Sequence, residues 1–237
     1  MTAPTISYLQ WFARQLAQAG LRRAFGVPGG GTSLDLMSAL HDQGIETVIT
    51  AREDAAVIMA GVSGLLAGGP GLAFTTRGPG LASALNGLAS AALDRLPALV
   101  ISEDFDAADL DYMSHQVLPQ SSLVAPILSQ GHGGELAASP AALEGWLATG
   151  GSTELPAPAV MFQRAADFSR QVPAENTTRA EAKHSTPDLD ETRALLASAR
   201  RPVFIVGLDA ARTGLADDLR ALVHKLAAPV LCTYMAK

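Results

Sequence analysis

The sequence predicts an α/β fold: a mainly parallel sheet with helices on both faces, followed by a short second α/β segment. Three observations predict this class. Apolar runs of strand length alternate with longer segments of helical periodicity along the 237 residues, a pattern typical of parallel sheets covered on both faces. Glycine-rich turns follow several of the apolar runs. Apolar residues make up 48% of the chain but aromatic residues only 5%, so we expect small side chains to pack the helices on the sheet.

The elements of the first part follow in chain order from hydrophobic periodicity. Residues 6–19 are predicted to form an amphipathic helix, because their apolar side chains recur near one face. Strands are expected at the apolar runs 23–26, 47–50, 71–75 and 98–102, with helices between them. The polar stretch 104–120 is expected to be rich in loops, 141–148 to be a helix and 159–163 to be the last strand.

The rest of the chain is expected to be a linker and a second domain. Residues 169–187 are polar and contain few apolar side chains, which predicts an interdomain linker. This linker would separate a first domain, 1–168, from residues 188–237. In that last part we expect helices and strands to alternate, at 189–199, 203–206, 215–226 and 230–233.

Composition excludes several classes of protein. The net charge is −6 and no basic block is present, which argues against a nucleic-acid partner. The single cysteine, Cys232, excludes an internal disulfide and suits a reducing compartment. Residues 1–20 lack the apolar core of a signal peptide, so we expect a cytoplasmic protein. Because Cys232 falls in an apolar strand, we expect its thiol to be packed.

A membrane span is considered because residues 55–74 contain no charged side chain. A window of that length can cross a bilayer as a helix. Glycines and a proline interrupt this window, however, and such residues mark turns. We therefore expect a buried helix, a turn and a buried strand, and no membrane partner.

Glu53 is the candidate catalytic residue. It stands where a β-branched run gives way to an alanine-rich apolar stretch, so a strand is expected to deliver one carboxyl group to the start of a helix. Apolar surroundings favour the protonated form of an acid, and such a group at a strand's carboxyl end can donate a proton to a ring nitrogen. The alternative is that Glu53 only stabilises the positive end of the helix.

Two glycine-rich turns flank this position in the sequence. Residues 24–34 and 73–82 each read as a strand, a turn and a helix, with Pro28-Gly29-Gly30 in the first turn and Gly78-Pro79-Gly80 in the second. Glycine lets the main chain approach a ligand closely. Either turn alone is ordinary punctuation of a βα connection, but their order around the acid is more specific.

With these residues, the chain resembles the pyrimidine-binding amino-terminal domain of thiamine diphosphate enzymes, in the branch that contains acetolactate synthase. The resemblance covers nearly the whole chain. It rests on Phe25-Gly26-Val27-Pro28-Gly29-Gly30, Arg52-Glu53, Gly78-Pro79-Gly80 and His115-Gln116 with Pro126. Residues 201–207 and 228–231 resemble the opening of the family's central domain, which implies that the second α/β domain is incomplete here.

The resemblance implies a carboligase or decarboxylase acting on a 2-oxo acid such as pyruvate, with thiamine diphosphate as cofactor. Glu53 would hydrogen-bond the aminopyrimidine ring nitrogen and favour the imino tautomer that activates the cofactor. The residues that would bind the cofactor are Pro28, Gly29, Gly30, Glu53, Gly78, Pro79 and Gly80. Gln116 and His115 would contact the substrate or the bound intermediate, with a structural role as the alternative for His115.

In the family a Gly-Asp-Gly signature with a downstream asparagine holds Mg²⁺ and the diphosphate, and these 237 residues do not contain it. The resemblance therefore implies that the chain supplies half of a site and is inactive alone, and that it works in a homodimer, a homotetramer or with a separate diphosphate-domain subunit. Segments 55–66 and 81–93 have few polar side chains on any helical face, so we expect an association surface beside Glu53, with Gly61 and Gly64 allowing close approach.

No other cofactor can be inferred from the pattern. Gly207 is isolated and gives no dinucleotide fingerprint, so FAD is neither predicted nor excluded. None of the histidines has metal-ligand spacing with another His, Cys or acid, so we expect no metal site within this chain.

The chain departs from the family pattern at four positions. Arg77, Ser83, Glu103 and Ser129 stand where a small polar residue, asparagine, glycine and lysine are usual. These departures leave the substrate open. The changes at Arg77, Ser83 and Glu103, together with the missing diphosphate signature, support an alternative: a non-catalytic pyrimidine-type domain that serves as an interaction or regulatory subunit. A nucleotide-binding α/β protein is disfavoured, because no phosphate loop with Lys and Ser or Thr precedes a helix.

Overall fold

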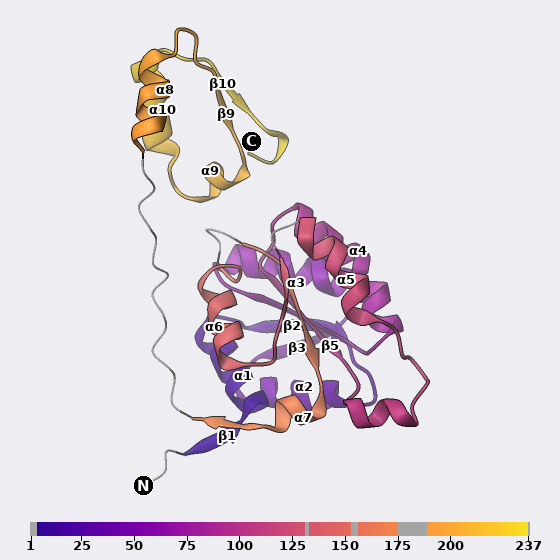
Figure 1. Cartoon of the computed structure of the whole chain (residues 1–237). Helices are drawn as coiled ribbons and strands as arrows, with labels where there is room; N and C mark the ends of the chain where they lie inside the picture. Colours follow the sequence, from indigo (N-terminus) through magenta and orange to yellow (C-terminus); the bar gives the residue numbers. More distant parts are fainter. Residues whose placement is uncertain (1–3, 131–132, 153–155, 175–188, 237) are drawn as a thin grey trace. The chain divides into compact units, whose positions relative to one another are not determined.

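The computed structural model describes residues 4–130, 133–152, 156–174 and 189–236. The chain divides into two compact units, Met1–Glu181 and Ala182–Lys237, called unit 1 and unit 2 below and both drawn in Figure 1.

Unit 1 is built on a six-stranded sheet in which every neighbouring pair is parallel. In spatial order its strands are β3 (Glu46–Ile49), β2 (Arg23–Val27), β4 (Gly71–Thr75), β5 (Ala98–Glu103), β7 (Ala159–Gln163) and β6 (Gly134–Leu136). Parallel neighbours need crossover connections, which here are mostly helices. The parallel sheet with helices on both faces confirms the predicted fold class.

Helices pack on both faces because successive strand residues point to opposite sides of the sheet. Leu72 and Phe74 of β4 belong to an apolar cluster with side chains of α1 (Tyr8–Gln18), α2 (Thr32–Asp42), α6 (Pro140–Ala148) and α7 (Ala165–Ser169). Ala73 belongs to a second cluster, with side chains of α3 (Glu53–Ala67), α4 (Pro79–Leu93) and α5 (Gln120–Gln130). Figure 1 shows α4 and α5 together on one side of the sheet.

A short antiparallel ladder lies beside the start of α1. β1 (Thr5–Ser7) pairs with β8 (Gln171–Pro173), so β8 occupies the first part of the stretch expected to be a linker. The helix starts at Tyr8, two residues later than predicted, because Ser7 and Gln10 form a reciprocal capping box. The rest of the predicted linker, 175–187, lies outside the described residues, and the domain boundaries at 168 and 187 stay a prediction.

The uncharged window 55–74 is a helix, a turn and a strand, as predicted. Helix α3 ends at Ala67, where Gly68 adopts the left-handed conformation with φ 72°, a common helix terminator. The fully buried β4 begins at Gly71. Among the described residues, no helix is long and apolar enough to cross a membrane.

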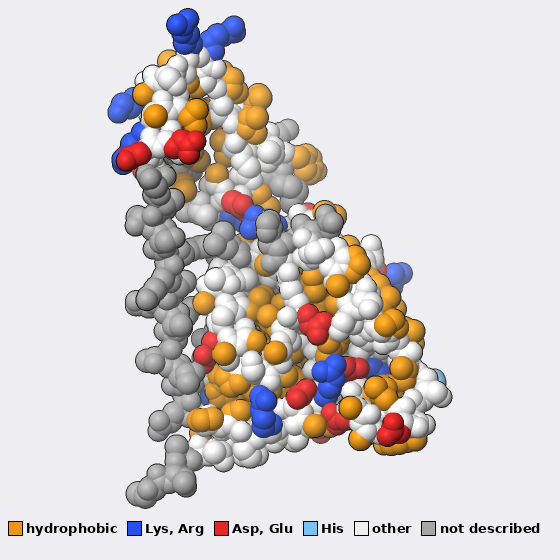
Figure 2. Space-filling view, viewed as in Figure 1, with side chains coloured by type: hydrophobic (Ala, Val, Ile, Leu, Met, Phe, Trp, Pro, Cys, Tyr) orange, Lys and Arg blue, Asp and Glu red, His pale blue; other side chains and the backbone are white. Residues whose placement is uncertain are grey.

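Helix α3 buries one face and exposes another. Gly61 and Gly64 pack inside unit 1, against Leu96 and the backbone at residues 69–71, so the expectation that they allow close approach of a partner is wrong. The exposed apolar side chains of α3 are Ile58, Met59, Val62 and Leu66, called the α3 surface below. Figure 2 shows further apolar side chains along the side of unit 1 that carries α4 and α5.

Unit 2 contains β9 (Phe204–Val206) paired in parallel with β10 (Val230–Cys232). Its helices are α8 (Asp190–Ser198), α9 (Leu208–Arg212) and α10 (Ala216–Leu226), and the 3₁₀ turn η2 (Tyr234–Ala236) follows β10. The prediction that the Cys232 thiol is packed is wrong. Cys232 is exposed, because β10 lies at the edge of a two-stranded ladder and all three of its residues are exposed.

Candidate functional site

The carboxyl ends of the parallel strands of unit 1 lie at one edge of the sheet. The register pairs Gly26 with Ile49, Val27 with Thr75, and Thr75 with Ser102. The residues that directly follow β2, β3 and β4 are therefore neighbours at this edge, and they include Glu53 and both glycine turns. In open parallel sheets, ligands bind at this edge.

The first glycine turn, residues 28–31, is held by the start of α2. The N–H of Gly29 donates to Oγ of Ser33 over 2.9 Å, and that hydroxyl donates back to the Gly29 carbonyl over 3.2 Å. A Cβ added at Gly29 would lie 2.4 Å from Oγ1 of Thr76 and 2.5 Å from Oε2 of Glu103. Glycine at position 29 is thus required by close packing, whereas a Cβ at Gly30 would meet no atom within 4 Å.

Glu53 and Asp54 begin α3 side by side but have different surroundings. Asp54 is only 7% exposed and accepts hydrogen bonds from the Arg52 guanidinium at 2.9 and 2.7 Å, from the Ala55 N–H at 2.8 Å and from Asn86 at 3.4 Å. The bonds from Arg52 contribute most to lowering the pKa of Asp54 below its ordinary value. Asp54 therefore serves the start of the helix and stays ionised.

Glu53 is half-buried and remains available for a ligand. Within the described part of the chain, its carboxylate takes part in no hydrogen bond or salt bridge, although the Arg52 charge lies near it. Sequence reasoning weighed Glu53 itself as the acid that stabilises the helix start. In the structure Asp54 makes that contact, because its shorter side chain reaches the adjacent N–H.

The second glycine turn, residues 76–80, lies against the segment that carries Gln116. Gly78 has φ 59°, and a Cβ there would lie 2.1 Å from the carbonyl oxygen of Gln116. Gln116 itself has φ 64°, a left-handed conformation that is uncommon for a residue with a side chain. Pro79 is the first residue of α4, where its fixed φ and missing N–H suit a helix start. The structure therefore brings Gln116 to the second turn, while His115 is exposed beside it.

A buried acid, Glu103, connects the two turns. It ends β5 and is 1% exposed. Its Oε1 accepts the Ser33 N–H over 2.8 Å, and its Oε2 accepts the Thr76 hydroxyl over 3.1 Å. The Arg77 Nε lies 3.5 Å from the same Oε2. Burial is the largest single influence on the pKa of Glu103 and raises it, but Ser33, Thr76 and Arg77 together outweigh burial and hold this pKa below its ordinary value.

Gln120 joins the second turn to the end of β5 through its side-chain amide. Its Oε1 accepts the Gly78 N–H over 2.9 Å and the Ser102 hydroxyl over 3.0 Å. Its Nε2 donates to the Glu103 carbonyl over 3.1 Å and to Oδ1 of Asp104 over 3.0 Å. Gln120 is 5% exposed, so its side-chain amide is paired away from water, as a buried polar group needs to be.

Sequence reasoning assigned no role to Asp54 or Thr76, placed Gln120 only within the family-like stretch from His115 to Pro126, and named Glu103 and Arg77 only as departures from a pattern. A signal for Glu103 was present. An acid that ends an otherwise apolar strand is expected to need a buried cationic or hydrogen-bonding partner, and Arg77 follows the neighbouring strand. No comparable signal predicts the contacts of Gln120, whose partners lie 16 to 42 residues away.

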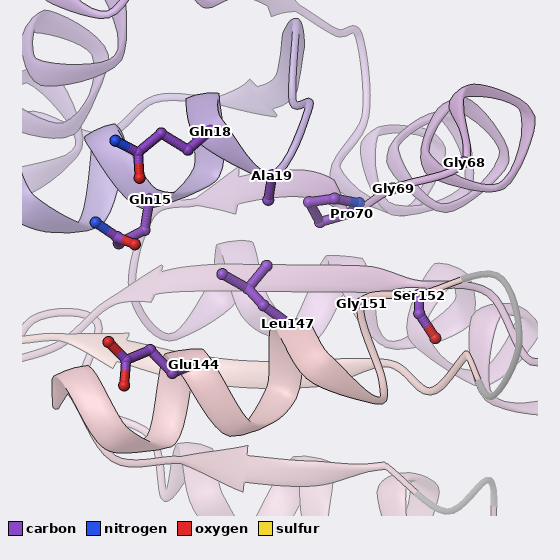
Figure 3. A pocket seen from close by; sticks show the side chains of 10 residues that line it. All are labelled: Gln15, Gln18, Ala19, Gly68, Gly69, Pro70, Glu144, Leu147, Gly151 and Ser152. Carbon is purple, nitrogen blue, oxygen red and sulfur yellow. The ribbon is translucent and has the colours of Figure 1, made fainter. Parts of the chain in front are cut away.

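A separate pocket lies away from this edge and contains none of the predicted site residues. It has a volume of about 370 Å³ and is lined by the end of α1, the turn before β4, and α6 with the loop after it (Figure 3). The turn Gly68, Gly69 and Pro70 leads into the amino end of β4. This pocket is therefore at the opposite edge of the sheet from Glu53.

The described residues at this edge fit the aminopyrimidine ring of the cofactor that the resemblance implies, but they do not fit its diphosphate group. A half-buried carboxyl group that makes no hydrogen bond or salt bridge within the described residues, at the edge where both glycine turns lie, can receive a flat nitrogen heterocycle. Among the described residues, no three His, Cys, Asp or Glu side chains are grouped so that they could hold a metal ion. A diphosphate bound through Mg²⁺ would need such oxygen ligands.

Comparisons with known proteins agree with the resemblance found in the sequence. A family model described as thiamine pyrophosphate enzyme, N-terminal TPP binding domain, matches residues 6–123. A second, described as thiamine pyrophosphate enzyme, central domain, matches residues 189–237. Together the two matches cover more than half of the chain.

Curated relatives match nearly the whole chain at modest identity. A probable 2-ketoarginine decarboxylase of Pseudomonas aeruginosa is 32% identical over 98% of this chain and 43% of its own length. The acetolactate synthase isozyme 3 large subunit of Escherichia coli is 29% identical over 97% of this chain and 42% of its own. Pyruvate oxidase of Lactiplantibacillus plantarum is 26% identical over 92% of this chain and 37% of its own length. The chain thus spans about two fifths of the length of these relatives.

Proposed function

Because this chain belongs to the thiamine pyrophosphate enzyme family, we propose that it supplies the cofactor-activating half of a thiamine diphosphate-dependent decarboxylase or carboligase that acts on a 2-oxo acid. The observation that carries the proposal is Glu53, a half-buried acid at the carboxyl edge of the sheet whose carboxylate makes no hydrogen bond or salt bridge within the described part of the chain. Pyruvate and 2-ketoarginine are the first substrates to assay, because the relatives include an acetolactate synthase and a probable 2-ketoarginine decarboxylase.

In this proposal each residue at the edge has a physical role. Glu53 holds a proton at a ring nitrogen of the aminopyrimidine, as a positioned general acid–base group. Pro28, Gly29 and Gly30 on one side, and Gly78, Pro79 and Gly80 on the other, place main chain against the ring. Gln116, beside Gly78, contacts the substrate, and His115 lies next to it. Thiamine diphosphate, when bound, supplies the carbanion chemistry and the electron sink for decarboxylation.

The charged end of the cofactor is assigned to another domain. The Gly-Asp-Gly signature is missing from these 237 residues, so we infer that Mg²⁺ and the diphosphate bind to a domain of a second copy or of a separate subunit. A homodimer or homotetramer satisfies this requirement. The α3 surface supports it, since Ile58, Met59 and Val62 are 36%, 42% and 41% exposed on the helix that begins with Glu53.

The experiment that tests the function is Glu53→Gln in the complete enzyme. An amide cannot hold the same proton at the ring nitrogen, so turnover should fall by about a hundredfold or more. Glu46→Gln is the matched control, because Glu46 lies at the opposite end of β3 and its side chain is 62% exposed. Cofactor-dependent turnover of 2-oxo acids is the measurement. Near-normal turnover of the Glu53 variant contradicts the assignment.

A non-catalytic interaction subunit is the second candidate, because Glu103 and Arg77 fill the space between the two turns where the family usually has small residues. The gene sequence and the cofactor content of the purified protein distinguish the enzyme from the interaction subunit. If the reading frame beyond Lys237, or a neighbouring gene, encodes a diphosphate domain, the enzyme is supported. If neither does, and a purified complex lacks thiamine diphosphate, the interaction subunit is supported.

A further inference from the structure

Glu103 occupies the place at the start of α2 where an anion is attracted. Its carboxylate accepts the N–H of Ser33 at 2.8 Å, and Ser33 is the second residue of α2. Unpaired N–H groups and the helix dipole make such a start a site for negative charge. The Glu103 carboxylate already occupies this anion site at the start of α2. An anionic group of a ligand therefore cannot bind there.

Arg77 completes the arrangement from the second turn. Its side chain is 17% exposed and that of Glu103 is 1% exposed. The guanidinium lies over the ring of Phe105, 4.2 Å from its centroid, a favourable cation–π geometry. A Cβ added at Gly31 would lie 2.6 Å from Nη2 of Arg77, so the guanidinium packs closely against the first turn at this glycine.

The two charges therefore join three segments that are distant in sequence. Glu103 contacts the start of α2 and Thr76 through its carboxylate, and its carbonyl accepts Gln120 Nε2, whose Oε1 binds the Gly78 N–H. Gly29 and Gly31 both pack on this pair. Any movement of the first turn relative to the second would break buried, charge-assisted contacts, which are stronger than neutral ones.

We propose that Arg77 and Glu103 are a positioning pair that fixes the two glycine turns relative to one another, and thereby the width of the space in which the cofactor ring meets Glu53. This inference rests on the proposed function for its catalytic consequence. Neither residue is expected to touch the substrate. The pair acts through Gly29, Gly31 and Gly78.

The first test measures the turns themselves and needs no activity. Amide hydrogen exchange is compared in the 237-residue chain for the wild type, Arg77→Gln, Glu103→Gln and the double variant. We expect exchange at the amides of Gly29, Ser33 and Gly78 to accelerate at least tenfold in both single variants. The matched control is the double variant Arg23→Gln/Glu46→Gln, which removes an ion pair of 2.7 Å whose side chains are 61% and 62% exposed. Its exchange at these amides should equal that of the wild type.

The second test measures catalysis in the complete enzyme. Both single variants should lower kcat about tenfold while changing the KM for thiamine diphosphate less than about threefold, because the charged end of the cofactor binds elsewhere. The loss in the double variant should equal the larger single loss, since residues that act as one unit are not additive. If a single variant fails to fold, Arg77→Lys, which keeps the charge but not the planar stack, should lower kcat by a smaller factor.

The outcomes separate the two proposals. Unchanged exchange at Gly29, Ser33 and Gly78, or losses in kcat that multiply in the double variant, overturns the positioning pair. A wild-type complete enzyme without thiamine diphosphate-dependent activity overturns the proposed function, and in that case the exchange experiment still decides whether the pair holds the turns.

Discussion

At the scale of single residues, adjacent acids at the start of α3 differ in what they contact. Asp54 is enclosed by Arg52, Asn86 and the helix backbone, whereas the Glu53 carboxylate has no such contact among the described residues. Glu103 resembles Asp54 and differs from Glu53, since it is buried and neighbours from two segments, Ser33 on one and Thr76 and Arg77 on the other, hold its pKa below the ordinary value. The surroundings of each carboxyl group, not its residue type, therefore decide its use.

Gly78 should be the least replaceable glycine of the second turn. We expect Gly78→Ala to lower the free energy of unfolding by about 2 to 4 kcal/mol, because a left-handed φ is unfavourable for alanine and the new Cβ would overlap a backbone oxygen. Gly30→Ala is the control, since a Cβ there meets nothing within 4 Å, and its change should stay below about 1 kcal/mol. Urea unfolding of the 237-residue chain measures both. Equal effects would show that the contact between Gly78 and Gln116 is absent in solution.

Glu103 should make stability depend on pH. Its folded-state pKa is lowered, so its contribution is fully present above the unfolded-state pKa of about 4.3 and is lost as the pH falls through the folded-state value. At pH 7, Glu103→Gln should reduce the free energy of unfolding by about 2 kcal/mol, through loss of hydrogen bonds to a charged group. The difference between wild type and variant should shrink as the pH falls below about 5. A difference that stays constant from pH 7 to pH 3 would contradict ionisation of Glu103.

At the scale of elements, glycine sets how closely helices approach the sheet and one another. A Cβ at Gly71 would lie 1.9 Å from the Ala60 carbonyl oxygen, and one at Gly87 would lie 2.3 Å from the Asp54 carbonyl oxygen. These contacts bring α3 against β4 at Ala60 and its first turn against α4 at Asp54, so the helix is fixed on two sides. The position of Glu53 at the edge of the sheet follows from this packing.

The α3 surface should mediate association of the chain with itself or with its partner subunit. We expect the wild-type chain to associate at high micromolar concentration, and Ile58→Gln/Val62→Gln to weaken the association at least tenfold, because the burial of two apolar side chains is lost. The unfolding midpoint should change little, since both side chains are more than a third exposed in the single chain. Sedimentation equilibrium measures the association. A wild-type chain that is monomeric at this concentration argues against self-association.

At the scale of the whole molecule, unit 1 brings together the residues proposed to bind the cofactor ring. Unit 1 places Glu53 and both glycine turns at one edge of a single sheet. The 237 residues contain no Gly-Asp-Gly signature, and the described residues contain no cluster of metal ligands. Under the proposed function, the diphosphate therefore binds to a further domain.

The isolated 237-residue chain should bind thiamine diphosphate weakly. Only the ring end finds complementary groups here, so we expect no binding in the micromolar range, with or without Mg²⁺. Isothermal titration calorimetry of the chain measures this, with the complete enzyme as the positive control. Magnesium-dependent micromolar binding by the isolated chain would reveal a diphosphate site within these residues.

The local pattern of apolar, glycine and polar residues was sufficient to predict much of the fold and the candidate site residues. The strands at 23–26, 71–75, 98–102 and 159–163 were predicted within about two residues of their ends, because apolar runs bounded by glycine and polar residues depend on near neighbours in sequence. The glycine turns and the placement of Glu53 at a strand end have the same local origin. The antiparallel ladder of β1 and β8 and the strand β6 were not predicted, since strands of three residues are stabilised by pairing with distant segments.

The sequence by itself determined the fold class, the family and the candidate acid. Only the tertiary structure decided which charges meet. Arg77 and Glu103 are brought together by the parallel register that pairs Thr75 with Ser102, and Asp54 rather than Glu53 is enclosed because Arg52 and Asn86 converge on it. Periodicity reports which face of an element is apolar, but contacts between elements depend on register and packing, which arise only when the sheet has formed.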